Sequence, residues 1–293
     1  MPDDRARSQA AASTPPSPRV AAPGTGETSA WLDLFRAAAE DVRGVLANLP
    51  SRAEREPVVG AGWGGDDTTA IDAAAERVIV ARLQSAGADF LLVSEELGEM
   101  RVGGGGDLRV VVDPIDGSLN AKRGLPFFSV SLALADGPTM ADVRLGYVFD
   151  FGSGEEWAAE RGGGAALNGS RIEGPGPKRE VEVLALEATR TSLVADKAAA
   201  FSGLAYRLRI LGSLAISLCH LAAGRVDAVC SLKPARAVDI AAAQLLVRER
   251  GLAIELPEAG PFLEAPLDTV ARSRVVAAGT PAVCAAVATA LGA

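Results

Sequence analysis

The order of apolar and polar residues along the chain predicts both helices and strands. Apolar residues recur at helical spacing over 31–49, where Pro50 ends the series, and again over 71–83. A glycine-rich loop at 60–65 separates these two helices. Over 128–135 apolar residues alternate instead with serine and alanine, which is the period of a strand with two different faces. The chain therefore begins with helices and continues into a sheet.

Short apolar runs next to turn residues predict the other elements. The runs at 89–93 and 108–112 are typical of buried strands, and Asn168-Gly169 is typical of a tight turn. We expect strands at 143–149, 156–160, 181–186, 226–232, 252–256 and 274–278, and helices at 213–223, 237–250 and the C-terminal end. Helices mixed with several antiparallel strands favour an α+β or layered α/β fold over a barrel or a Rossmann fold.

Length and composition indicate how the chain is divided. With 293 residues, 48% of them hydrophobic, it can form one large domain or two smaller ones. Residues 1–27 are rich in proline, alanine and serine and lack the apolar core of a secretory signal, so we predict a disordered leader there. Gly174–Pro177 is the predicted boundary between subdomains at 28–177 and 178–293.

Charge and rare residues exclude several classes of function. The net charge of −8 argues against a nucleic-acid partner, and no apolar run is long enough to cross a membrane. Three cysteines without CxxC spacing favour a reduced, cytoplasmic protein. The single histidine, His220, excludes a histidine-rich zinc site and, unless it takes part itself, a Ser-His-Asp triad.

The segment DPIDGS at 113–118 ends an apolar strand with two aspartates three residues apart. Pro114 disfavours a helical conformation of Asp113, so the chain turns there. The two carboxylates and the carbonyl between them can then face one point, and ligands of oxygen alone suit Mg²⁺ rather than zinc or copper. Gly117 and Ser118 follow where a helix can start, with free N–H groups for an anion. An ordinary turn capped by aspartate explains the same residues without a ligand.

Three other acidic sites change this interpretation. Glu95 and Glu96 end another apolar strand, where two adjacent carboxylates are costly unless a positive charge is near. Asp72 lies on the second predicted helix, and Asp239 lies in the first turn of the helix predicted at 237–250. Each has a structural explanation of its own, as an exposed loop, a solvated helix position or a favourable charge at a helix start.

Together these segments resemble the inositol monophosphatase–fructose-1,6-bisphosphatase family of Mg²⁺-dependent, lithium-sensitive phosphatases. The resemblance covers roughly residues 31 to 280, and several motifs in register are far more specific than one. It implies the sugar-phosphatase fold, an α/β/α/β/α sandwich with mixed, largely antiparallel sheets, and a homodimer. The matching segments are, in order, Asp66…Thr69…Asp72, Glu95-Glu96, the DPIDGS segment, Gly124 to Ser131, Asn168-Gly169, Gly212-Ser213 and Val238 to Ala242.

The resemblance also implies roles for single residues. It places one Mg²⁺ on Glu95, Asp113 and the Ile115 carbonyl, a second on Asp113, Asp116 and Asp239, and a third, weaker ion at Glu95. Mn²⁺ is an alternative metal and Li⁺ an inhibitor. Asp72 and Ser118 would orient and deprotonate the attacking water beside Glu95. The phosphate would lie on the N–H groups of Gly117 and Ser118, with Gly212 and Ser213 on the substrate side.

Some positions depart from the animal inositol monophosphatases. Val238 replaces their tryptophan, and Leu232 stands where they place a glutamate that binds inositol hydroxyls. The stretches DPIDGSLNAKRGLPFFSVSLAL and RAVDIAAAQLLV are similar instead to the archaeal-type branch, which has fructose-1,6-bisphosphatase and inositol monophosphatase activity. Four basic residues are either contacts for a second phosphate or solvated surface: Lys233, Arg236, Arg190 and Arg209.

We therefore expect a Mg²⁺-dependent phosphatase that acts on a small sugar or polyol phosphate. The alternatives within the family are a 3′-phosphoadenosine-type nucleotide phosphatase and a histidinol phosphatase. An alternative of another class is a catalytically silent relative that binds a metabolite.

Overall fold

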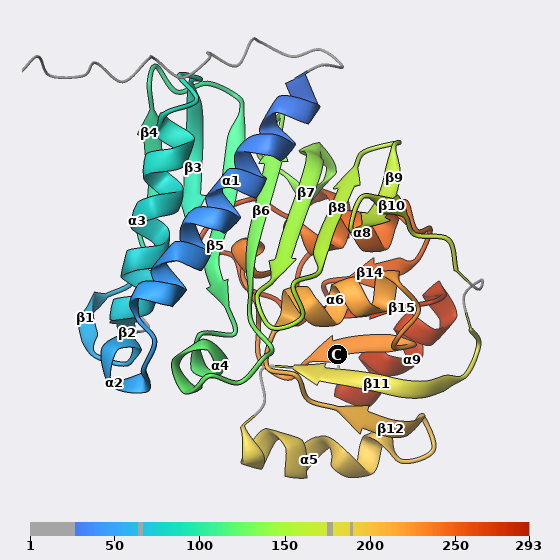
Figure 1. The fold of residues 1–293 in the computed structure, drawn as a ribbon. Coiled ribbons are helices and arrows are strands. Elements are labelled where there is room, and N and C mark those ends of the chain that lie inside the picture. The colour runs from blue at the N-terminus through green and yellow to red at the C-terminus, as the bar shows by residue number, and fades with distance from the viewer. Residues whose placement is uncertain (1–26, 64–66, 175–177, 188–189, 293) are drawn as a thin grey trace, which may run out of the picture.

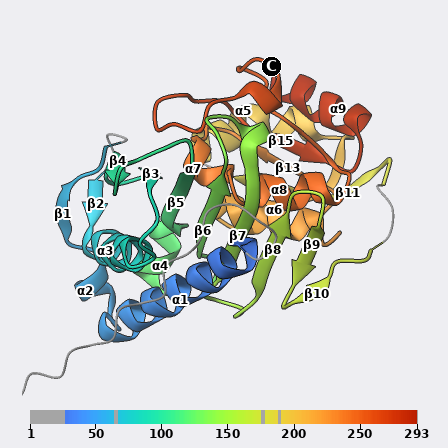
Figure 2. The same ribbon diagram turned by 90° about the horizontal axis from the view of Figure 1, so that it is seen from above.

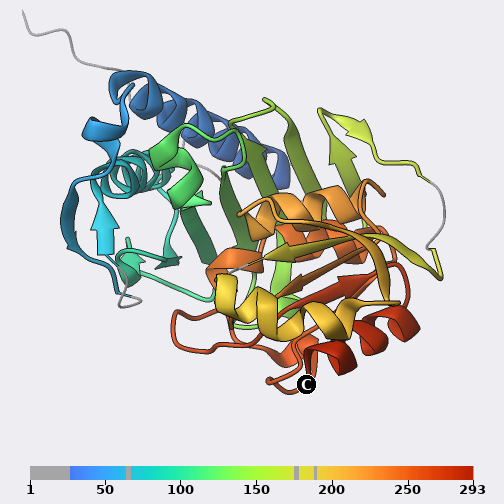
Figure 3. The same cartoon turned by 90° about the horizontal axis from the view of Figure 1, so that it is seen from below.

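The computed structural model describes residues 27–63, 67–174, 178–187 and 190–292. These residues form five layers, α/β/α/β/α, which confirms the predicted sandwich (Figures 1 and 2). One face of the first sheet is covered by two helices, α1 (Glu27–Asn48) and α3 (Ala70–Gln84). Between the two sheets lie α6 (Leu214–Ala222) and α8 (Ala243–Glu249), and the outer layer is α5 (Thr191–Phe201) and α9 (Pro281–Leu291). Figure 3 shows the middle helices, in orange, between the two sheets.

The first sheet has eight strands in the order β10-β9-β8-β7-β6-β5-β3-β4. Only the pair β3–β5 is parallel among the described strands of this sheet, and every other pair is antiparallel. Asn168 and Gly169, both with positive φ, form the predicted turn between the last two strands. The bounds are β3 (Phe90–Ser94), β4 (Gly98–Val102), β5 (Arg109–Asp116), β6 (Ser129–Ala135), β7 (Val143–Asp150), β8 (Glu156–Glu160), β9 (Gly164–Leu167) and β10 (Ser170–Arg171).

The second sheet has five strands in the order β12-β11-β13-β15-β14. Strand β11 is parallel to both of its neighbours, whereas β15 is antiparallel to β13 and β14. Both sheets are therefore mixed, as predicted, and the antiparallel pairs predominate in the larger one. The bounds are β11 (Val181–Glu187), β12 (Ala205–Arg209), β13 (Ala228–Ser231), β14 (Ala253–Glu255) and β15 (Val276–Ala278).

Several short elements differ from the sequence prediction. The glycine-rich loop predicted at 60–65 is partly a strand, because Gly60 and Ala61 end β1 (Val58–Ala61), which pairs with β2 (Asp67–Thr69). The helix predicted at 237–250 is two helices, α7 (Ala237–Ile240) and α8. Asp66 lies outside the described residues. The remaining short elements are α2 (Arg52–Arg55), α4 (Ser118–Arg123), η1 (Met140–Asp142) and η2 (Phe262–Glu264).

The structure describes the start of the first predicted subdomain and the region around the predicted boundary between the two. Glu27, which the sequence prediction assigns to the leader, belongs instead to helix α1, and its buried carboxylate pairs with Arg144 at 3.0 Å. The first sheet ends at Arg171 and the second begins at Val181, and one apolar core contains residues of both sheets and of the helices between them. The subdomain division stays a prediction. In the described part of the chain no helix is both long and apolar enough to span a membrane.

Candidate active site

The DPIDGS segment begins in strand β5 and lies at one end of the large sheet. Its pairing with β6 changes register between Asp113 and Asp116, so the strand bulges there and both carboxylates reach one cavity. Gly117 then takes a left-handed conformation, with φ of 92°, and α4 begins at Ser118. A β-carbon at Gly117 would lie 2.7 Å from the Phe127 carbonyl oxygen, so only glycine fits this turn. The expected turn is present, and its shape follows from the bulge and the glycine.

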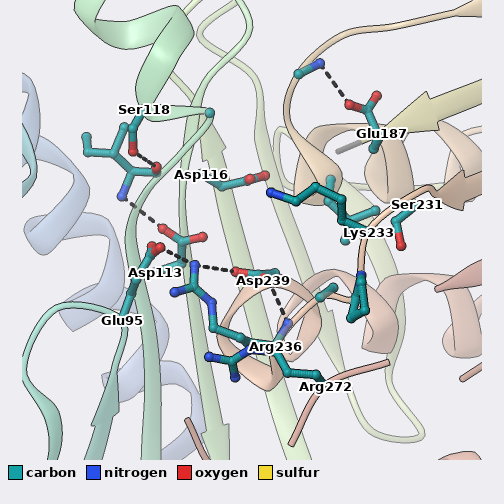
Figure 4. A pocket seen from close by; sticks show the side chains of 16 residues that line it. Glu95, Asp113, Asp116, Ser118, Glu187, Ser231, Lys233, Arg236, Asp239 and Arg272 are labelled. Atoms are coloured by element: carbon teal, nitrogen blue, oxygen red, sulfur yellow. Dashed lines mark hydrogen bonds and ion pairs between the residues drawn. The ribbon is translucent and has the colours of Figure 1, made fainter. Parts of the chain in front are cut away.

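Three carboxylates from three separate elements converge beside this turn (Figure 4). One oxygen from each of Glu95, Asp113 and Asp239 lies within 4.8 Å of the other two. We call these three residues the acid cluster. Glu95 follows β3, Asp113 lies on β5 and Asp239 lies in α7. Asp116 lines the same cavity, so the structure brings together all four carboxylates that the sequence predicts as metal ligands.

The surroundings of Glu95, Asp113 and Asp116 oppose the ionisation of these three carboxylates. Burial, with repulsion from Asp239 and Glu96, raises the pKa of Glu95 to about 8, although Arg236 acts in the opposite direction. Burial and the neighbouring carboxylates raise the pKa of Asp113 well above its usual value. Burial also raises the pKa of Asp116 to about 6, against hydrogen bonds that favour its charged form. The site needs more positive charge than the chain supplies, and a donor set of oxygens alone fits a hard divalent cation such as Mg²⁺.

The structure places the Ile115 carbonyl, a predicted metal ligand, and Asp72, a predicted partner of the water, in different environments. The Ile115 carbonyl lines the cavity side of the turn and accepts a hydrogen bond of 2.9 Å from the Ser118 hydroxyl. Asp72 is buried in the first turn of α3, where its Oδ2 accepts from the Thr69 hydroxyl at 2.5 Å. Its Oδ1 is buried without a partner among the described residues, and Asp72 is not part of the cavity lining that they form. A buried oxygen of this kind fits a bound water.

Arg236 lies within the acid cluster rather than out toward a second phosphate (Figure 4). Its guanidinium contacts Glu95 and, at 3.3 Å, Asp239, while its backbone N–H donates to Asp239 at 2.7 Å. Lys233 is exposed and lines the cavity. Arg190, which precedes α5, and Arg209, which ends β12, are exposed, and neither belongs to the described lining of the cavity. The structure therefore brings two of the four predicted basic residues to the site.

The cavity has a volume of about 290 Å³. Ser213 lies just behind its wall, where its hydroxyl donates to Asp116 at 2.5 Å. Ser231 at the end of β13 lines the cavity, whereas Leu232, the position compared with the inositol-binding glutamate, is buried and does not belong to the described lining. The predicted residues that do line it are Glu95, Asp113, Ile115, Asp116, Gly117, Ser118, Gly212, Lys233, Arg236 and Asp239.

Sequence reasoning missed two charged residues of the lining, Glu187 and Arg272. Glu187 ends the apolar strand β11, as Glu95 follows the apolar strand β3, so the same pattern could have indicated it. Arg272 lies in a segment between η2 and β15 that has no regular pattern, and only the fold brings its side chain next to Arg236 (Figure 4).

Comparison with known proteins identifies the family of this chain. The model of the inositol monophosphatase family matches residues 28–291. A fructose-1,6-bisphosphatase/inositol-1-monophosphatase of Methanothermobacter thermautotrophicus is 32% identical over 259 residues, which cover 85% of this chain and 92% of that protein. A protein named Nus factor SuhB, from Pasteurella multocida, is 35% identical over 193 residues, which cover 64% of this chain and 70% of that protein.

Solved protein structures are also similar to this one. A crystal structure of an inositol monophosphatase–fructose 1,6-bisphosphatase matches with a TM-score of 0.77 at 26% identity, over 89% of this chain and 99% of that one. An inositol monophosphatase of Thermotoga maritima matches with a TM-score of 0.73 at 26% identity, over 90% of this chain and 98% of that one. The chain belongs to the inositol monophosphatase family and is a phosphatase.

Proposed function

We propose that the protein hydrolyses the phosphate monoester of a small sugar or polyol in a Mg²⁺-dependent reaction, with inositol monophosphate or fructose 1,6-bisphosphate as substrate. The acid cluster is the observation that carries this proposal. Its three carboxylates lie within 4.8 Å of one another and are supplied by elements far apart in the sequence. Such a group is costly to bury unless a cation neutralises it.

Two sets of oxygen ligands in this chain would hold the metal. Glu95, Asp113 and the Ile115 carbonyl form one set, and Asp113, Asp116 and Asp239 form the other, with a third, weaker ion at Glu95. When bound, Mg²⁺ lowers the pKa of a bound water and neutralises charge on the phosphoryl group. Mn²⁺ is the alternative ion in these sets.

The other residues of the site bind the phosphate and orient the water. The left-handed Gly117 precedes α4, and the N–H groups of Gly117 and Ser118 at this helix start would donate to phosphate oxygens. The Ser118 hydroxyl orients the attacking water, and the unpartnered Oδ1 of Asp72 accepts a proton from it. The 212–213 segment would contact the rest of the substrate.

The charges on the cavity wall bear on the choice of substrate. Lys233 and Arg272 line the cavity beyond the acid cluster, so a second phosphate would meet positive charge there. Ser231 offers a hydroxyl to a polyol on the same wall. The archaeal relatives are named for both activities, and we propose that this chain, like them, accepts both substrates. We further propose that it works as a homodimer in the cytoplasm and has no nucleic-acid partner.

A panel of phosphate esters, assayed with and without Mg²⁺ and then with Li⁺, tests the proposal. We expect hydrolysis of inositol monophosphate or fructose 1,6-bisphosphate that requires Mg²⁺ and is inhibited by Li⁺. Faster hydrolysis of a 3′-phosphoadenosine nucleotide or of histidinol phosphate would replace the proposed substrate by one of these. An absence of hydrolysis of every ester at saturating Mg²⁺ would favour a catalytically silent metabolite-binding protein.

A further inference from the structure

Glu187 is a buried carboxylate in the cavity wall that has no role in the proposed reaction. It ends β11 and pairs in register with Ser231 of β13. Burying a carboxylate is unfavourable unless hydrogen bonds replace its water. Here its Oε1 accepts from the Ser217 hydroxyl at 2.6 Å and from the Leu211 N–H at 3.2 Å, and its Oε2 accepts from the Gly212 N–H at 2.8 Å. Two of these three donors belong to one backbone turn.

This turn, residues 211–213, connects Glu187 with the DPIDGS segment. The Asn120 side chain donates to the Leu211 carbonyl at 2.7 Å, so the turn is held from both sides. Its next residue, Ser213, donates its hydroxyl to Oδ2 of Asp116 at 2.5 Å, and the Ala215 N–H donates to the same oxygen at 2.7 Å. A continuous set of hydrogen bonds therefore runs from Glu187 through the turn to Asp116.

We propose that Glu187 is a positioning residue, which fixes the 211–213 turn and thereby the carboxylate of Asp116. The inference rests on the proposed function, in which Asp116 binds Mg²⁺. Glu187 need not touch the metal or the phosphate in this role. Groups that orient a metal ligand in this way typically change metal affinity by about 10- to 100-fold when they are replaced.

The chemistry of the turn requires a carboxylate rather than an amide. The turn presents two N–H donors, and a carboxylate offers an acceptor oxygen to each. In Glu187→Gln one oxygen becomes an NH₂ donor, which would face a backbone N–H, so at least one bond to the turn is lost. Glu187→Asp keeps both oxygens but is one methylene shorter, and it should fail to reach the turn.

The test measures Mg²⁺ binding to the full chain by isothermal titration calorimetry. Asp227 provides a matched control, because its carboxylate accepts from the N–H groups of Glu182 and Val183 at the opposite end of β11. We expect Glu187→Gln and Glu187→Asp to bind Mg²⁺ about tenfold more weakly than the wild type. Asp227→Asn should bind it as the wild type does, even where the melting temperature falls.

A double-mutant cycle identifies the route of the effect. Ser213→Ala removes the last hydrogen bond of the set, so Glu187→Gln should weaken Mg²⁺ binding much less in that background than in the wild type. Equal Mg²⁺ affinity of the wild type and both folded Glu187 variants would overturn the positioning role while leaving the proposed function intact. A wild type that neither binds Mg²⁺ nor hydrolyses phosphate esters would overturn the proposed function and this inference with it.

Discussion

Asp113 lies at the centre of the acid cluster, and its surroundings favour the protonated form. Its side chain is almost fully buried, and the repulsion from Glu95, Asp116 and Asp239 adds to the effect of burial on its pKa. Arg236 is the neighbour that acts in the opposite direction. A residue with this environment stabilises a bound cation but not the metal-free fold.

Asp113→Asn should therefore separate activity from stability. The amide keeps the size of the side chain but removes its charge, so we expect Mg²⁺-dependent turnover to fall by at least 10³-fold, the loss expected when a central metal ligand is removed. The melting temperature without metal should stay the same or rise, because repulsion within the acid cluster decreases. Activity assays and calorimetry of one preparation measure both effects. Retained turnover would contradict the metal assignment.

Lys233 is a better probe of a second phosphate than Arg236. Arg236 contacts Glu95 and Asp239, so Arg236→Ala should impair the hydrolysis of every substrate. Lys233 lies exposed on the cavity wall, and Lys233→Ala should raise KM for fructose 1,6-bisphosphate about tenfold with little change for inositol monophosphate. Lys178→Ala, a change of an exposed lysine on another surface, is the control. Equal changes of KM for both substrates would argue against a second phosphate at Lys233.

At the scale of elements, the site depends on how α4 starts and ends. Both of its flanking glycines are left-handed, with φ of 92° at Gly117 and 72° at Gly124. Gly117→Ala adds a clash with the Phe127 carbonyl to the cost of the left-handed conformation, and we expect a loss of about 2–3 kcal/mol and of most activity. Gly124→Ala meets nothing within 4 Å and should cost only about 1 kcal/mol. Denaturant unfolding and activity assays compare the two, and similar losses of activity would contradict this role of Gly117.

The elements that the sequence predicts well are those with one consistently buried face. Periodicity predicts helices α1 and α3 and strand β6, short apolar runs predict β5 and β7, and all five lie in the core. Strands β4 and β12 were not predicted, because they form the edges of the two sheets and alternate charged with apolar residues over only five positions. An alternation this short carries little information, because β propensity depends strongly on the neighbouring strand.

The residues of the candidate site also include some that the sequence predicts and some that it does not. Its carboxylates could be predicted because Glu95 and Asp113 follow apolar runs, Asp239 lies in the first turn of a predicted helix and the motifs occur in order. The contact of Arg236 with Glu95 could not, since it joins residues 141 positions apart. Arg190 and Arg209 were chosen for their charge alone, and the fold places them outside the cavity lining formed by the described residues.

At the scale of the whole molecule, the buried carboxyls should make the metal-free fold less stable as the pH rises. Burial raises the pKa of Asp116 to about 6, of Glu187 to about 7 and of Glu95 to about 8, all above the values of an unfolded chain. The folded state therefore binds protons more tightly, and this contribution is complete below about pH 4 and is lost as the pH rises toward 8.

In EDTA we accordingly expect the melting temperature to fall between about pH 5 and pH 8, by about 2–4 °C for each kcal/mol lost. Glu187→Gln, which has no proton to lose, should reduce this slope below pH 7. Mg²⁺ binds the ionised carboxylates, so its addition should raise the melting temperature more at pH 8 than at pH 6. Differential scanning calorimetry over this range measures all three effects. A melting temperature in EDTA that is constant or rises toward pH 8 would contradict the assignment of these carboxyls as buried groups that the metal neutralises.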